Sequence, residues 1–480
     1  MSQENAGNKP LIRHVNRQQM SWRAVDVERL IGEDHPARAI WALVGRLDLS
    51  RFYEGIESSA EEGGRPAFDP QLLISLWVYA YTQGIGSARE VARRCEHDPA
   101  FQWLTGLDEV NYHTLADFRV EKQKELDELF TQVLAALSKE GLITLEQVMQ
   151  DGTKIKAQAS VRSYRQEETI REHLERARRR VAEMGDPRNE ETSPRTKQAR
   201  ERARREQQER LENALQELEK LQERKQGEQA KMHHSDGGLA LSYNAQISAD
   251  AAHGLIVGVA VTPEVNDYAQ LLPAVERVEE RLKKKPRQMV ADAGYTTRET
   301  IEAMAERKID FLGSLTGAEK LSRADTMDRL PPSAFVYDRE RDCFVCPEGK
   351  LLGYEGRHTK KKGFTYYRYE AEWRDCQSCA RKPQCCPENQ KQGRSVVRGE
   401  ESAAVLAFHQ KMATEKAQAQ YRRRGGVVEF CHAWIKSKLG LRQFHVRGLV
   451  KVQMEMLWAC LTYNLQQWIR LRKLDRAAAN

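Results

Sequence analysis

The chain has 480 residues, of which 40% are apolar and 31% charged, and its formal net charge is +7. A chain of this length corresponds to about two to four domains of roughly 100–200 residues each. Its apolar content is high enough to form buried cores, which excludes a wholly disordered chain.

The longest apolar runs, such as residues 72–80 and 456–463, fall short of the roughly 20 residues that a membrane-spanning helix needs. We therefore expect no membrane partner. The first ten residues, MSQENAGNKP, show no secretory signal. These features predict a protein of the cytoplasm of a prokaryote-like cell.

Residues 34–142 are predicted to be helical, with apolar positions three to four residues apart in segments 35–47, 70–82, 88–95 and 114–139. Gly84 and Gly86 separate two of these helices, and Ser87 is a candidate cap of the second. Arg89, Arg93 and Arg94 then lie on or near its exposed face. Residues 1–142 are predicted to be a helical DNA-binding domain, and the alternative is a helical bundle with surface arginines.

An α/β core with a mixed sheet is predicted next along the chain. A strand at 145–150 leads to Asp151, and strands at 241–250 and 255–261 form a hairpin. An amphipathic helix at 267–284 follows, then a buried strand at 288–291 that ends at Asp292. A helix at 297–307 and a strand at 309–315 complete the pattern.

Residues 157–231 interrupt this core with 19 basic and 16 acidic residues. Two apolar seams of helical period, around Leu174 and Leu218, flank a breaker at 185–194. We predict an inserted charged helical hairpin. The alternative is a partly disordered charged tract.

Charge is concentrated near the C-terminus, where residues 421–473 contain eleven Lys or Arg and two acids. Such a basic stripe is typical of a polyphosphate partner, although a solvated basic helix face has the same composition. Glu429 is an isolated acid within this stripe. Together with the aspartates after two strands, it suggests a carboxylate site for Mg²⁺ or Mn²⁺ that acts on a phosphodiester.

Three segments resemble the catalytic segments of the DDE transposases of bacterial insertion sequences: DGTKIKA at Asp151, ADAGYTTRET at Asp292 and YRRRGGVVEFCHAWIKSKLG at Glu429. The resemblance extends from about residue 34 to 474, apart from the charged insertion. It implies a ribonuclease-H-like catalytic core formed by residues 143–334 and 398–480. It also implies that Asp151, Asp292 and Glu429 hold two metal ions per active site.

The third segment also resembles a Tyr, Arg, Glu and Lys signature of related transposases, at Tyr421, Arg424, Glu429 and Lys436. Four residues separate Arg424 from Glu429 where three are expected, so Arg422 or Arg423 is an alternative for the arginine. The resemblance implies that these side chains grip DNA.

Six of the nine cysteines lie within residues 343–386. In a reducing compartment, such short-spaced pairs favour structural Zn²⁺ over disulfides; buried free thiols and an iron-sulfur cluster are the alternatives. The family resemblance selects Cys346, Cys376, Cys379 and Cys385, with Cys343 and Cys386 as substitutes. Residues 335–397 are thus expected to be an inserted Cys-rich zinc module.

The function that follows is a transposase that binds double-stranded DNA at terminal inverted repeats, cleaves it there and joins the freed 3′ hydroxyl to target DNA. We expect it to act as a homo-oligomer on the bacterial nucleoid. The alternatives are a catalytically silent DNA-binding regulator derived from a transposase, and a helical scaffold that assembles protein complexes through the charged insertion.

Overall fold

The computed structural model describes residues 24–54, 66–158, 239–314, 334–359, 365–386, 392–399 and 402–479, together with short stretches such as 172–176, 202–209 and 231–233. No helix in these ranges combines the length and the apolar character that a membrane span requires.

The N-terminal part of the chain is helical, as predicted. Its helices are α1 (Pro36–Val44), α2 (Ser50–Tyr53), α3 (Pro70–Thr82), α4 (Ala88–His97), α5 (Pro99–Thr105), α6 (Tyr112–Glu121) and α7 (Gln123–Lys139), preceded by a short turn, η1 (Val27–Arg29). Helix α3 begins as its sequence dictates, because Pro70 occupies the first turn and the Asp69 carboxylate accepts a hydrogen bond from the backbone N–H of Gln71.

Two details of the helical prediction are wrong. The single helix expected at residues 114–139 is two helices, because Lys122 adopts a non-helical backbone (φ −98°, ψ 54°) between α6 and α7. Ser87 stands at the start of α4 with an extended backbone, but its side chain makes no capping hydrogen bond.

The central sheet is mixed, as predicted, and runs in the order β2-β3-β1-β5-β6, with β4 also paired to β3. Its strands are β1 (Val148–Lys156), β2 (Lys231–His233), β3 (Leu239–Asp250), β4 (Leu255–Thr262), β5 (Gln288–Ala291) and β6 (Asp310–Leu312). β1 pairs antiparallel with β3 and parallel with β5, and β5 pairs parallel with β6. Helices α10 (Leu271–Leu282) and α11 (Arg298–Glu306) connect these strands.

Two boundaries in the sheet differ from the prediction. Asp151 is the fourth residue of β1 and does not follow its end, because β1 continues along β3 as far as the pair Lys156 and Ser242. Helix α10 begins at Leu271, so Asp267, predicted to be its first residue, lies in the loop between β4 and α10.

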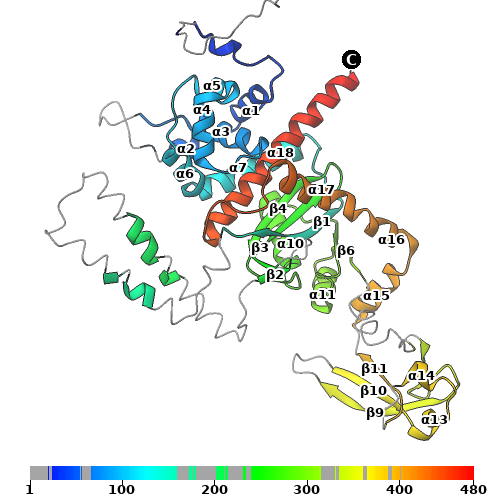
Figure 1. Cartoon of the computed structure of the whole chain (residues 1–480). Helices are drawn as coiled ribbons and strands as arrows, with labels where there is room; N and C mark the ends of the chain where they lie inside the picture. Colours follow the sequence, from blue (N-terminus) through cyan, green and yellow to red (C-terminus); the bar gives the residue numbers. More distant parts are fainter. Residues whose placement is uncertain are drawn as a thin grey trace, which may run out of the picture.

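The C-terminal part places a broken helix and a long helix against this sheet (Figure 1). The segments are α15 (Ala403–Met412), α16 (Glu415–Arg422), the π-helical turn η5 (Gly425–Glu429), α17 (Phe430–Ala433), a second π-helical turn η6 (Trp434–Lys438) and α18 (Leu449–Ala479). Helix α18 packs on β4, α7 and α3. One continuous apolar core therefore joins the N-terminal helices, the sheet and α18.

The cysteine-rich part forms a second, five-stranded antiparallel sheet in the order β11-β10-β9-β8-β7. It consists of β7 (Val336–Asp338), β8 (Cys343–Val345), β9 (Leu351–Thr359), β10 (Thr365–Ala371), α13 (Trp373–Gln377), α14 (Lys382–Cys385) and β11 (Ser395–Gly399). A separate apolar cluster around Phe344, Leu352 and Tyr369 supports it. In Figure 1 it lies apart from the central sheet, beyond α15.

The predicted hairpin at residues 157–231 lies mostly outside the described residues. Within it, residues 172–176 and 202–209 are helical. Arg178 Nη2 lies 3.1 Å from Glu212 Oε1, an ion pair between the two predicted arms.

Candidate active site at the edge of the central sheet

Two of the three predicted acids lie at one edge of the sheet, on neighbouring strands. β5 pairs with β1 only as far as Gln150 and Ala291, so Asp151 and Asp292 each follow the last paired residue. Each carboxylate is oriented locally: Asp151 accepts a hydrogen bond from Gly152 N–H (2.9 Å), and Asp292 accepts one from Gly294 N–H (2.8 Å). Ends of parallel strands are where open α/β sheets form ligand sites.

The third acid, Glu429, comes from the broken C-terminal helix and is joined to the sheet by an arginine. Arg424 Nη1 lies 3.1 Å from Asp151 Oδ2, and its Nη2 lies 3.9 Å from Glu429 Oε1. The side chain of Glu429 is 62% exposed, whereas that of Arg424 is only 16% exposed. The guanidinium therefore lies between the strand acid and the helix acid.

The unexpected spacing between Arg424 and Glu429 coincides with a π-helical turn. Residues Gly425–Glu429 form η5, in which hydrogen bonds run over five residues instead of four. Such a turn accommodates one additional residue and keeps positions five apart on the same face. Of the three arginines considered, Arg424 contacts the carboxylates, while Arg422 and Arg423 are exposed.

The electrostatics of Asp151 reflect its burial. Burial raises the pKa of Asp151 to about 6, the Arg424 guanidinium acts in the opposite direction, and Asp292 and Asp267 add to the rise. Burial alone would lower the pKa of Arg424, but Asp151, Tyr421 and Asp292 together outweigh burial, so the pKa is raised. The site thus holds acidic groups that one guanidinium only partly neutralises.

Two more side chains of the broken helix face this edge. His432 Nδ1 lies 3.9 Å from Asp151 Oδ2, and burial lowers the pKa of His432 to about 3, so the imidazole is neutral. Lys436 is half-buried; burial and Arg442 lower its pKa, while Asp151 acts in the opposite direction. The spacing of Glu429, His432 and Lys436 places all three along one side of the helix.

The donor set suits a hard divalent cation, because carboxylate oxygens are the ligands that Mg²⁺ and Mn²⁺ prefer. Among the described residues, no three His, Cys, Asp or Glu side chains are arranged closely enough to hold a metal ion. The carboxylates are thus of the chemical type that binds a divalent metal. In the described arrangement, however, Asp151 forms an ion pair with Arg424.

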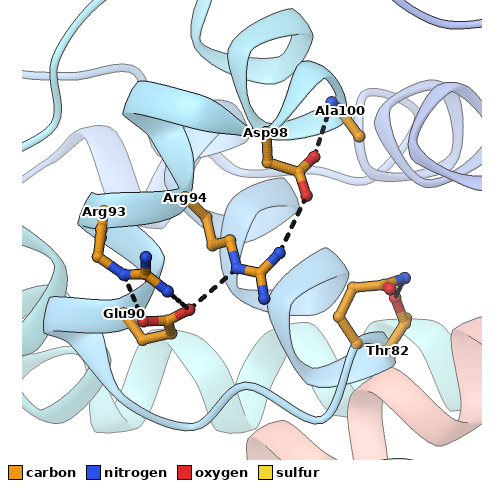
Figure 2. A network of polar contacts seen from close by, with 7 residues as sticks. Thr82, Glu90, Arg93, Arg94, Asp98 and Ala100 are labelled. Atoms are coloured by element: carbon orange, nitrogen blue, oxygen red, sulfur yellow. Dashed lines mark hydrogen bonds and ion pairs between the residues drawn. The ribbon is translucent and has the colours of Figure 1, made fainter.

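Two of the three arginines noted on α4, Arg93 and Arg94, form ion pairs with nearby acids. Glu90 Oε1 lies 2.7 Å from Arg93 Nη2 and 2.9 Å from Arg94 Nε. Figure 2 shows these two pairs and the contact of Arg94 with Asp98. Arg89 lies over the ring of Tyr112, 5.1 Å from its centroid. The side chain of Arg93 is 61% exposed and that of Arg94 is 43% exposed. Their positive charge is therefore accessible from solvent but partly neutralised by Glu90.

Five of the six clustered cysteines line one pocket in the second sheet: Cys346, Cys376, Cys379, Cys385 and Cys386. Cys343, predicted as a substitute ligand, is buried in β8 and does not line it. Lys350 N–H donates to Cys346 Sγ (3.3 Å), and Arg394 N–H donates to Cys376 Sγ (3.4 Å). All nine cysteines lie in the described part, and their thiols are free.

Two residues at the sheet edge were not predicted. Asp267 follows strand β4 in the sequence, which was the available signal, but the apolar pattern predicts it as the first residue of a helix. His432 lies three residues after Glu429 in the third catalytic segment, and nothing local in the sequence indicates its contact with Asp151.

The fold and site define an α/β protein with acids gathered at the edge of a mixed sheet and a helical N-terminal region. Two family models match the chain: "Transposase domain (DUF772)" over residues 25–121 and "Transposase DDE domain" over residues 345–469. These two matches support a DDE transposase of an insertion sequence, which is an enzyme. Neither curated proteins nor solved structures gave a significant match.

Proposed function

We propose that this transposase binds double-stranded DNA at the terminal inverted repeats of its element, hydrolyses phosphodiester bonds there and transfers the 3′ ends to target DNA. The observation that carries the proposal is the meeting of Asp151 and Asp292 at one sheet edge with Arg424 and Glu429 of the facing helix. The strand order, with β1 central between an antiparallel and a parallel neighbour, supports a ribonuclease-H-like core.

Asp151, Asp292 and Glu429 would hold two Mg²⁺ or Mn²⁺ ions. Bound divalent ions supply activation of the attacking water or 3′ hydroxyl and stabilisation of the leaving oxygen. Arg424 and Lys436 offer positive charge to the phosphate beside these acids, and Tyr421, Arg422 and Arg423 extend that surface along α16. Arg89 and Arg93 of α4 are proposed to contact DNA outside the site.

Cleavage of both element ends requires two sites, so we propose a homo-oligomer assembled on DNA in the bacterial cytoplasm, associated with the nucleoid. The catalytically silent regulator is the second candidate. It is disfavoured because all three acids are present and two of them meet at the sheet edge.

The test uses DNA that carries the element's own ends, with Mg²⁺ and with Mn²⁺. Asp151→Asn, Asp292→Asn and Glu429→Gln each remove metal-binding charge with little change in volume, so cleavage should fall to background while DNA binding persists in a gel-shift assay. Asp108→Asn, in an exposed loop, is the control and should cleave normally. Wild-type protein that binds the ends but never cleaves them would instead identify a regulator.

We propose further that the cysteine pocket holds one structural Zn²⁺. Four thiolates are the preferred tetrahedral ligands of zinc, and Cys346, Cys376, Cys379 and Cys385 all line the pocket, with Cys386 as a fifth thiol. The two backbone N–H groups that donate to Cys346 and Cys376 would stabilise negative sulfur.

Elemental analysis of purified protein tests this site. Wild type and Cys343→Ser should contain about one zinc per chain, since Cys343 does not line the pocket, while Cys376→Ser should lose it. A folded wild-type protein without zinc would favour free thiols, and iron in its place would favour a cluster.

A further inference from the structure

The loop between η6 and α18, residues 439–448, carries a group of exposed cations on or beside it. They are Lys438, Arg442, Arg447 and Lys451. We infer that this connecting loop binds the phosphate backbone of duplex DNA between α4 and the catalytic acids. The inference rests on the proposed function, because it assigns a further part of the chain to the same DNA.

The four cations differ from others of the basic stripe in having no acidic partner. No acid in the described part of the chain forms an ion pair with any of them. By contrast, Arg424 pairs with Asp151, and Arg472 pairs with Glu140. Exposed like charges without partners repel one another, and a polyanion that neutralises them also releases its own counterions.

The backbone of the connecting loop is held from two sides. On the sheet side, Lys156 N–H donates to the Arg442 carbonyl (3.1 Å), and Phe444 N–H donates to the Lys156 carbonyl (2.9 Å). On the side of α18, His445 N–H donates to the fully buried Glu455 (2.8 Å). The cations therefore extend from a fixed support, so little loop freedom is lost when a ligand binds.

The turn between α3 and α4 packs directly on this loop. A Cβ on Gly440 would lie 3.0 Å from the carbonyl oxygen of Gly84, and a Cβ on Gly86 would lie 2.3 Å from the ring of His445. Such close approach places α4, which carries Arg89, beside the loop. At the other end of the loop, η6 carries Lys436 toward Asp151. The loop thus lies between α4 and the catalytic acids.

Two other occupants compete with DNA for this surface. The charged insertion leaves the sheet beside the loop, where Gln443 Nε2 donates to the Ala157 carbonyl (3.2 Å). Its 19 basic residues outnumber its 16 acids, whereas duplex DNA carries one negative charge per about 1.7 Å of axis. A second copy of the chain could instead cover the exposed Leu449 and Val450. DNA is favoured because the four cations are unpaired and clustered.

The test replaces three of the cations together, as Arg442→Gln, Arg447→Gln and Lys451→Gln in the full chain. Fluorescence anisotropy measures the Kd for a labelled duplex that carries an element end, over a range of KCl concentrations. Each lost phosphate contact should lower the slope of log Kd against log KCl concentration by about 0.9, so the slope should fall by about two to three. An unrelated duplex should show the same change, because backbone contacts carry no sequence information.

The matched control removes the same charge elsewhere, as Lys283→Gln, Lys284→Gln and Lys285→Gln. These exposed lysines precede the start of β5, at the end of this strand opposite Asp292. The control should keep the wild-type slope. Both variants should melt at the wild-type temperature, since exposed side chains away from special contacts add little to stability.

Each outcome decides the inference. A wild-type slope in the loop variant, as either competing occupant predicts, would overturn it and leave the proposed function intact. An equal fall in the control would also overturn it, because net charge alone would then explain the change. Wild-type protein that binds neither duplex would overturn the inference and the proposed function together. If the triple variant fails to fold, Arg447→Gln alone should still lower the slope by about 0.9, and an unchanged slope would overturn the inference.

Discussion

At the scale of single residues, Glu90 shows how an exposed acid is held by its neighbours. Hydrogen bonds from Arg93 and Arg94 lower the pKa of Glu90 from 4.5 to about 2. Both pairs span one turn of α4, as Figure 2 shows. Exposed pairs of this kind contribute little and weaken in salt.

The pH dependence of this contribution has a definite sign. Since the folded pKa lies below the unfolded one, the stability that Glu90 contributes is present above about pH 4.5 and is lost as the pH falls through about 2. Glu90→Gln should therefore lower the melting temperature at pH 7, and its difference from wild type should vanish toward pH 2. Thermal unfolding across this range measures it. Glu109→Gln, in an exposed loop, is the control, and a difference that grows on acidification would contradict the sign.

At the scale of elements, the π-helical turn explains how an irregular spacing still brings Arg424 and Glu429 together. A regular α-helix aligns residues four apart, and η5 aligns residues five apart. The insertion costs regular hydrogen bonding, and both π-helical turns of the chain's described part flank the helix that carries His432. Turns of this type occur frequently at functional sites.

A deletion tests this explanation. Removing Gly426, whose Cβ position has no atom within 4 Å, should convert η5 to a regular turn and keep Arg424 facing Glu429. The variant should melt at or above the wild-type temperature and retain cleavage within about tenfold, equivalent to about 1.4 kcal/mol. Inserting Ala after Gly426 should rotate Arg424 by about 100° and reduce cleavage more strongly. Loss of cleavage on deletion but not on insertion would contradict the explanation.

At the scale of the whole molecule, a buried charge cluster joins the N-terminal helices to α18. Arg119 is 6% exposed and its Nη1 lies 3.7 Å from the fully buried Glu455. Arg119 also donates to the carbonyl of Gly86 and lies 4.5 Å from the centroid of the Trp77 ring. Glu455 accepts two hydrogen bonds from His445, each 2.8 Å. Glu455 is the second acid of the basic stripe at residues 421–473, and its burial makes it part of the core.

Breaking this cluster should destabilise the molecule as a unit. Arg119→Met leaves a buried carboxylate with only His445 as a partner, and should cost about 3–5 kcal/mol of unfolding free energy. Urea unfolding measures the loss, with the exposed Arg46→Met as control. Adding Glu455→Gln to Arg119→Met should recover part of the stability, because the unpaired charge is removed. A loss as small as that of the control would mean that the pair contributes nothing.

Local patterns in the sequence determined the positions of most helices and strands of this protein. Apolar spacing predicts residues 70–82 as a helix, which is α3, and the hairpin and the strand before Asp292 follow from apolar runs and turns. Asp151 and Asp292 were predicted together because strand ends converge at sheet edges. Such signals are readable because they depend on neighbours a few residues away.

Only the tertiary structure decided which distant groups meet. Arg424 reaches Asp151, Asp267 is held by Asn244 and Gln246, and His432 lies beside Asp151, through pairings between residues far apart in the sequence. Five cysteines, but not Cys343, share one pocket for the same reason. The cause is physical: strand register and helix packing set these contacts, and local periodicity carries no information about which strand or helix lies opposite.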